Sequence, residues 1–140
     1  MTRWAGEGEL VPMLLLRQAL PEVTVRASIP DNLLTYLPLV VVRRMPTLGS
    51  PAPRFWDNVQ INVQCWSDAT AELDPASAAS ALSDQCRRVL WEAWDNQTVT
   101  AAGSIANLRE TQAPMELIDP DLPRLGRYIA NYTLRVRNAA

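Results

Sequence analysis

The sequence contains no lysine and no histidine, so all thirteen of its positive charges are arginines. Histidine is the usual general base and the commonest metal ligand near neutral pH. Lysine is the usual Schiff-base nucleophile and the phosphate-binding residue of a P-loop. Because both are missing, only carboxylates, hydroxyls and two cysteines remain for chemistry. The composition therefore favours a binding or structural protein over an enzyme.

The sequence also lacks the common catalytic and metal-binding motifs. It has no GxGxxG, GxxxxGK or GxSxG segment, and Cys65 and Cys86 form no zinc-binding spacing. Both cysteines fall on predicted inward faces, which indicates buried free thiols. Four acidic residues could be imagined as a cation site, but three of them lie in a turn before a helix, where Asp serves as turn former and cap. We expect no metal and no cofactor; the four are Asp57, Asp68, Glu72 and Asp74.

Long apolar runs and a basic excess are missing as well. The longest apolar run, residues 10–16, has seven residues, and a membrane helix needs about 20. The N-terminal residues show no hydrophobic stretch of signal-peptide length. A net charge of −2 argues against a DNA-binding domain, although the pairs Arg43–Arg44 and Arg87–Arg88 could still touch phosphate. We expect a soluble protein of the cytoplasm, without membrane contact.

The first half of the chain predicts one helix and three strands within a single domain, 1–140. A helix is expected over 7–20, and Pro12 moves its true start to Glu9 or Leu10. Short strands are expected over 23–28 and 37–45, the second of them buried on both faces. Three prolines and a glycine predict a loop over 46–53.

The strand predicted over 54–66 has the clearest periodicity. Its odd positions are apolar except Asp57. The even positions from 58 to 64 are all amides, and they are flanked by Trp56 and Trp66. Asp74 and Pro75 then begin an amphipathic helix of about 20 residues. An edge strand broken by Pro114 is expected over 105–118, and a last strand over 127–137. The fold class is therefore α+β, in the order α-β-β-β-α-β-β, with two helices on a mixed or antiparallel sheet of about five strands.

Several segments, in this order, resemble the tail terminator proteins of long-tailed bacteriophages. After the early acidic helix these are residues 20–25 (LPEVTV), 30–32 (PDN), 37–44 (LPLVVVRR), 58–68 (NVQINVQCWSD) and 119–137 (DPDLPRLGRYIANYTLRVR). The resemblance covers nearly the whole chain. It implies a virion protein, assembled in the host cytoplasm, that forms a homohexameric ring on the head-proximal end of the tail tube. Such a ring stops tube polymerisation and joins the tail to the head.

The partners implied by the resemblance are the tail tube protein and a head-side connector, with DNA passing through the ring lumen without sequence-specific binding. A ring needs two different contact patches on each subunit. Tryptophan and arginine are enriched at such contacts, and Trp4 and Trp91 belong to the same surplus of tryptophan. The candidate contact residues are Arg43, Arg44, Leu48, Pro51, Arg54, Trp56, Trp66, Arg127, Arg135 and Arg137.

Three alternatives belong to other functional classes. One is another head–tail connector or completion protein, which the five predicted strands disfavour because such proteins are more often helical. A small carboxylate-dependent hydrolase or nuclease would need acids converging in a pocket, and the sequence does not show them. A toxin–antitoxin or regulatory module would usually show charge asymmetry, which the sequence also does not show.

Overall fold

The long helix expected after Asp74 is α2 (Pro75–Asp95), in a computed structural model that describes residues 8–46 and 55–138. The Asp74 carboxylate accepts a 2.7 Å hydrogen bond from the backbone N–H of Ser77, and Pro75 needs no partner at the first helical position. The shorter helix α1 (Leu10–Ala19) begins so that Pro12 falls in its first turn, as the sequence predicts. The start of α2 is therefore set by the Asp74 cap and Pro75, and the start of α1 by the position of Pro12.

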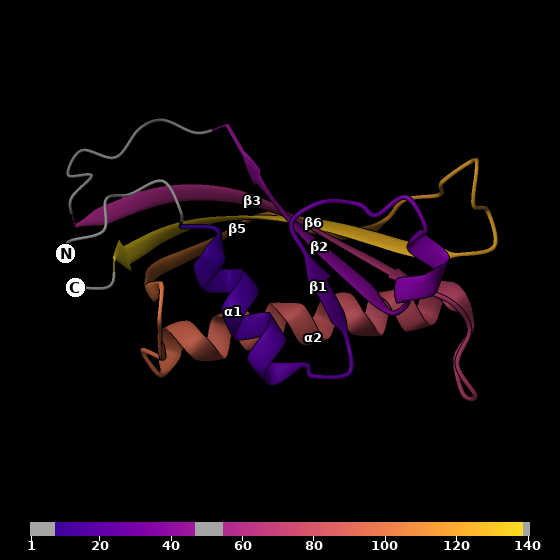
Figure 1. Ribbon diagram of the computed structural model, residues 1–140, viewed down its shortest axis with the longest axis horizontal. Helices are drawn as coiled ribbons and strands as arrows, with labels where there is room; N and C mark the ends of the chain where they lie inside the picture. The colour runs from indigo at the N-terminus through magenta and orange to yellow at the C-terminus, as the bar shows by residue number, and fades with distance from the viewer. Residues whose placement is uncertain (1–7, 47–54, 139–140) are drawn as a thin grey trace.

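One six-stranded sheet contains all the strands of the described residues (Figure 1). The strand order is β1-β2-β3-β6-β5-β4, with β1 and β2 parallel and every other pair antiparallel. The α+β prediction is confirmed, but the strand count is six and not five, because a two-residue strand precedes β5. The strands are β1 (Thr24–Arg26), β2 (Leu39–Met45), β3 (Trp56–Ser67), β4 (Val99–Thr100), β5 (Gly103–Glu116) and β6 (Gly126–Asn138).

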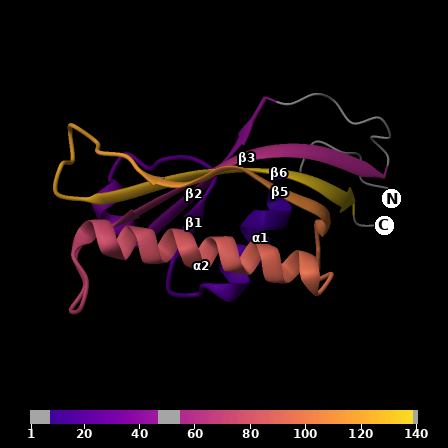
Figure 2. The same cartoon turned by 180° about the vertical axis from the view of Figure 1, so that it is seen from behind.

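Both helices pack on the same face of the curled sheet, with α2 running along its length (Figures 1 and 2). This face carries the apolar side of β3 and β6, including Ile61 and Leu134. Leu82 and Leu90 of α2, together with Leu16 of α1, complete the main core. The side chains of Ala130, Tyr132, Leu134 and Val136, which alternate along β6, are all buried on this face.

A smaller cluster lies at one end of the opposite face. Trp66 and Leu39 pack there with Leu33 of the 3-10 helix Leu33–Tyr36, which the sequence analysis did not predict. Leu125, from the loop before β6, completes the cluster. Residues 39–42 are therefore buried on both faces, as their β-branched run indicates.

A glycine allows β6 to begin against the start of α2. A Cβ atom at Gly126 would overlap the backbone carbonyl group of Pro75. No other residue could occupy this position without moving either the helix or the strand. The contact therefore fixes the first turn of α2 against the first residue of β6.

Candidate interaction surface on the open face of the sheet

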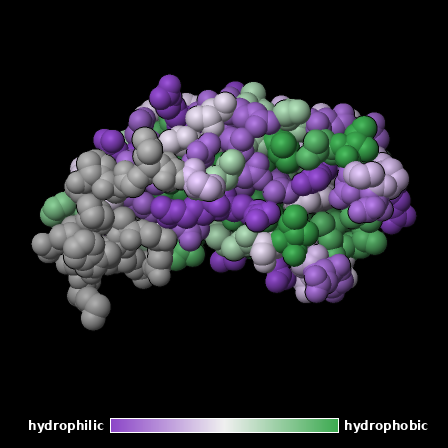
Figure 3. Space-filling view, turned by 90° about the horizontal axis from the view of Figure 1, so that it is seen from above, coloured by the Kyte–Doolittle hydropathy of each residue, from purple (hydrophilic) through white to green (hydrophobic). Residues whose placement is uncertain are grey.

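The face of the sheet away from the helices, here called the open face, is lined by polar side chains along most of its length. Paired residues on neighbouring strands share a face, so the register identifies its members. In Figure 3 hydrophilic side chains run along the middle of this face, and hydrophobic ones gather toward the end with the smaller cluster. Its central residues are Arg43, Asn58, Gln60, Asn62, Asn107, Arg109, Gln112, Asn131, Thr133, Arg135 and Arg137.

Three amide side chains form a continuous hydrogen-bonded row across this face. The Asn62 Nδ2 group on β3 donates to Asn131 Oδ1 on β6 at 2.8 Å. The Asn131 Nδ2 group in turn donates to Gln112 Oε1 on β5 at 2.8 Å. Each amide therefore holds its neighbour's orientation, and the row is half-buried, so it gives the centre of the face a fixed polar surface.

The open face ends in a tryptophan at each end of β3, and arginines from β6 cover both rings. The Arg137 guanidinium lies 5.3 Å from the ring centroid of Trp56, and Arg135 lies 6.0 Å from it. At the other end Arg127 lies 4.8 Å from the Trp66 ring and donates a 2.9 Å hydrogen bond to Gln64 Oε1. Cation–π contacts of this kind hold the arginines close to the sheet.

Positive charge is concentrated on the open face. Six of the seven arginines in the described strands fall on it, and the seventh, Arg44, faces the helices. The three carboxylates of the same strands, Asp57, Glu110 and Glu116, all lie on the helix-covered side. Among the described residues, none of the six arginines makes an ion pair. They are Arg26, Arg43, Arg109, Arg127, Arg135 and Arg137.

This concentration differs from the interpretation of the sequence. From the sequence, the second face of residues 54–66 is expected to carry amides and tryptophan without charge, and no charge asymmetry is expected for the chain. The charge comes from neighbouring strands, since Arg135 pairs with Asn58, and Arg109 pairs with Thr133 opposite Gln60. Arg109 was missed because only the pairing of β5 with β6 brings it onto this face, whereas Asn131 follows from the alternation of β6 itself.

Five of the ten predicted contact residues lie together on the open face: Arg43, Trp56, Arg127, Arg135 and Arg137. Trp66 shares the face but is buried, with 1% of its surface exposed, beneath Arg127. Three others, Leu48, Pro51 and Arg54, lie outside the described residues, as does Trp4.

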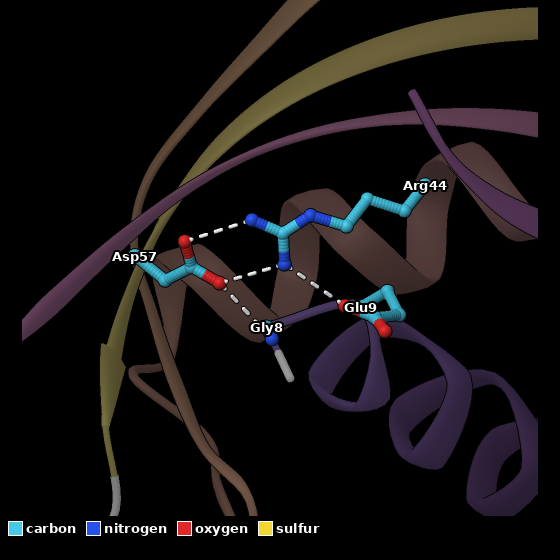
Figure 4. Close-up of polar contacts among 4 residues, drawn as sticks. All are labelled: Gly8, Glu9, Arg44 and Asp57. Carbon is cyan, nitrogen blue, oxygen red and sulfur yellow. Dashed lines mark hydrogen bonds and ion pairs between the residues drawn. The ribbon is translucent and has the colours of Figure 1, made fainter. Parts of the chain in front are cut away.

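The tenth residue, Arg44, is engaged on the helix-covered side (Figure 4). Its two terminal nitrogens donate to the Asp57 carboxylate at 2.8 and 3.0 Å, and Nη1 also donates to Glu9 at 3.0 Å. The Gly8 N–H donates to the same Asp57 carboxylate at 3.1 Å. The hydrogen bonds with Asp57, followed by those with Glu9, raise the pKa of Arg44 above its ordinary value. This network explains the one exception in the periodicity of β3, because Asp57 is a buried ion-pair partner.

The outer edge of β5 is a second notable surface. β4 pairs only with Gly103 and Ser104, and no other strand of the described residues pairs with the remaining length of β5 on that side. The C-terminal part of this edge is apolar, with Met115 46% exposed and Ile118 70% exposed just beyond the strand. The strand continues through Pro114 to Glu116, so the predicted break is wrong, but its pairing with β6 has register irregularities here, consistent with the expected edge position.

The C-terminal end of α2 carries a shallow hollow beside two tryptophans. The ring centroids of Trp91 and Trp94 are 5.4 Å apart. Trp94 Nε1 donates to the carbonyl oxygen of Ala106 on β5, so this ring is held by the sheet, while Trp91 is 38% exposed. The hollow has a volume of about 490 Å³ and is lined by Trp91, Glu92, Trp94, Asp95 and Gln97.

The described residues contain no group of three or more cysteine and carboxylate side chains that could hold a metal ion. Cys65 on β3 and Cys86 on α2 are free thiols in the core, as predicted. Contact with the Cys86 thiol, together with burial, raises the pKa of Cys65 well above its ordinary value. Neither helix is long and apolar enough to cross a membrane, within the ranges 8–46 and 55–138.

Comparison with known proteins adds one finding. A family model described as phage tail termination protein matches residues 7–120, well over half of the 140-residue chain. The match includes both helices, β1 to β5 and the whole of the Arg44–Asp57 network, and it ends before β6. No curated protein matches the chain.

Proposed function

Because this chain belongs to the phage tail termination protein family, we propose that it forms a homohexameric ring on the head-proximal end of the tail tube. The family consists of structural components of the virion tail. In the proposal the ring stops tube polymerisation, offers the head-side connector a joining surface, leaves a lumen for DNA, and is assembled in the host cytoplasm. The chain acts by binding and carries out no catalysis.

The uncovered edge of β5 is the observation that carries this proposal. An exposed strand edge presents unpaired backbone groups that can pair with another chain. Here the apolar side chains of Met115, Leu117 and Ile118 lie beside the edge and remain exposed. A surface of this kind fits a subunit that completes its contacts on assembly.

A closed ring requires a heterologous interface, in which two different patches of one subunit meet those of its neighbours. The opposite edge of the sheet offers a second patch, because β1 pairs only with residues 39–41 of β2. Residues 42–45 of β2 have no second strand partner among the described residues. We infer that the β5 edge of one copy contacts the region of β2 in the next.

The mass of the assembled species tests ring formation. Light scattering on the purified chain, alone and with tail tubes, should give a species of six times 15.6 kDa, free or at the tube end. Ile118→Asp should prevent this assembly without unfolding the chain, because Ile118 is 70% exposed. Val99→Asp is the matched control, because Val99 is 76% exposed but lies on β4, at the other end of β5.

Tube length tests the function itself. Adding the chain to polymerising tail tubes should cap one end and fix their length. A phage without the chain should make overlong tails that do not join heads. Tails of normal length joined to heads in its absence would refute the proposal. Normal-length tails that fail to join heads would instead indicate a connector or completion protein.

A further inference from the structure

We propose that the open face binds the phosphate backbone of duplex DNA, without reading its sequence. This deepens the proposed function, since it assigns a surface of the chain to the DNA that would pass through the ring. The binding itself requires only the single folded chain. The exposed arginines that would contact phosphate are Arg43, Arg109, Arg135 and Arg137.

The charge of this face is the first argument. All six open-face arginines lie on a sheet whose three described carboxylates point the other way, so no strand residue within 8–46 and 55–138 neutralises their charge on this face. The salt bridges formed between two described residues involve Arg44, Arg87 and Arg88, which lie on the helix side of the sheet or on α2. A polyanion is the partner that complements such a surface, because arginine contacts with phosphate release condensed counterions.

The polar side chains at the centre of the open face favour DNA over a protein as its partner. Protein–protein interfaces usually have an apolar centre depleted in charge, surrounded by a polar rim. The open face has the reverse arrangement: the amides Asn62, Asn131 and Gln112 occupy its centre, while the apolar cluster around Trp66 lies at one end. Protein–DNA interfaces are more polar and much more positively charged, and amide side chains are common phosphate ligands.

The geometry fits a double-stranded backbone. β2 and β5 are separated by three strand spacings, about 14 Å, so Arg43 and Arg109 can reach two phosphate rows about 12 Å apart across a major groove. Arg135 and Arg137 are two residues apart on β6, about 7 Å along the strand.

The tryptophans argue against single-stranded DNA as the preferred ligand. Binding of single strands relies on aromatic rings on which bases stack. Here Trp66 is buried beneath Arg127, and Arg135 and Arg137 lie over Trp56. The exposed centre of the face contains no aromatic ring among the described residues. Contacts through the sugar–phosphate backbone therefore dominate.

The experiment measures binding of the purified full-length chain to a fluorescent 25-base-pair duplex of arbitrary sequence, over a series of NaCl concentrations. Four exposed arginines predict a slope of log K against log salt of about −3 to −4. Affinity should then fall about a hundredfold between 50 and 200 mM salt. Duplexes of unrelated sequence should bind equally, and single-stranded DNA more weakly.

Matched variants locate the binding surface. Arg109→Gln with Arg135→Gln should reduce the magnitude of the slope by about two. Arg17→Gln with Arg88→Gln removes the same charge from the helix layer and should leave the slope unchanged. Arg109→Lys with Arg135→Lys keeps the charge and should retain most of the binding, so a loss through misfolding would be recognised. Thermal unfolding of each variant verifies the fold.

Three results would overturn the proposal: no duplex binding at 50 mM salt, equal effects of the two glutamine variants, or tighter binding of single-stranded DNA. If the open-face variant keeps its DNA affinity but no longer attaches to tail tubes, the face binds an acidic protein instead.

The ring proposal fails separately, because a chain that binds DNA normally but does not cap tubes would refute only the ring.

Discussion

The guanidinium of Arg44 and the carboxylate of Asp57 form a two-point hydrogen-bonded ion pair, 2.8 and 3.0 Å long, between β2 and β3. Asp57 is 4% exposed, and it also accepts a hydrogen bond from the N–H of Gly8, just before α1. The pair therefore connects two strands and the start of a helix through one carboxylate. Planar, two-point pairs of this kind are specific to arginine.

Replacement of Asp57 by Ala should lower the free energy of unfolding by about 2 kcal/mol, because it leaves the Gly8 N–H without this acceptor and removes a charged partner of Arg44. Chemical denaturation measures the change. A double-mutant cycle with Arg44→Ala should give a coupling of about 1 kcal/mol or more. Arg88→Ala, which breaks the exposed pair with Asp84, should cost less than about 0.5 kcal/mol. Equal costs for Asp57→Ala and Arg88→Ala would contradict this assignment.

Replacement of Gly126 by Ala should destabilise the chain by about 2 to 3 kcal/mol, because the new methyl group meets the backbone of Pro75, which cannot rotate away. Gly8→Ala provides the comparison. A methyl group there meets side-chain atoms of Val59 and Asp57 and no backbone atom of another element, so the cost should be smaller. Thermal unfolding of both variants ranks them, and the reverse order would show that α2 moves easily on the sheet.

The Asp74 cap should make the stability of α2 depend on acid pH. Hydrogen bonding by Ser77 lowers the pKa of Asp74 below its ordinary value of 3.8. Its stabilising effect is therefore fully present above pH 3.8 and is lost as the pH falls through the lower value in the folded state. Asp74→Ala should reduce the melting temperature at pH 7, and the difference from the native chain should shrink below pH 3.8. A difference that is constant down to pH 2 would exclude the carboxylate as the cap.

Both cysteines should resist labelling in the folded chain. Cys65 and Cys86 are each 0% exposed, and the raised pKa of Cys65 keeps its thiol protonated near neutral pH. At pH 8 a thiol reagent should label neither residue in native protein, and both in denaturant without a reductant. Rapid labelling of the native chain would show that α2 separates from β3.

Local sequence signals predicted the elements well, and the reasons are visible in particular residues. Asp74 and Pro75 mark the start of α2, and Pro12 limits the start of α1 to Leu10. The alternation along 54–66 predicted β3 because its apolar odd positions from Val59 to Cys65 belong to the main core, although Phe55, in the same alternation, is 61% exposed. The predicted ends of the last two strands differ by two residues or fewer, which is the usual uncertainty at element boundaries.

The candidate surface could be predicted only in part. Trp56, Arg135 and Arg137 could be chosen from residue type and alternation, and the alternation of β6 also places Asn131 on their face, but the position of Arg109 depends on strand order. Trp66 looked equivalent to Trp56 in the alternation of β3. It is buried because Leu33 and Leu125, distant in sequence, pack over it. Two-residue β4 carried no periodic signal, since two residues cannot show alternation.

The separation of charge across the sheet also gives the described part of the molecule an electric dipole directed from the helix layer to the open face. Six arginines without an ion pair among the described residues lie on the open face, while Arg44, Arg87 and Arg88 on the other side are each paired with a carboxylate, and Glu92 and Asp95 of α2 add negative charge there. In the field of a charged assembly, a diffusing copy therefore turns to a preferred orientation before any contact forms. Because salt screens this field, higher ionic strength should weaken the preferred orientation. The effect should lower the rate of association more than the stability of the finished complex.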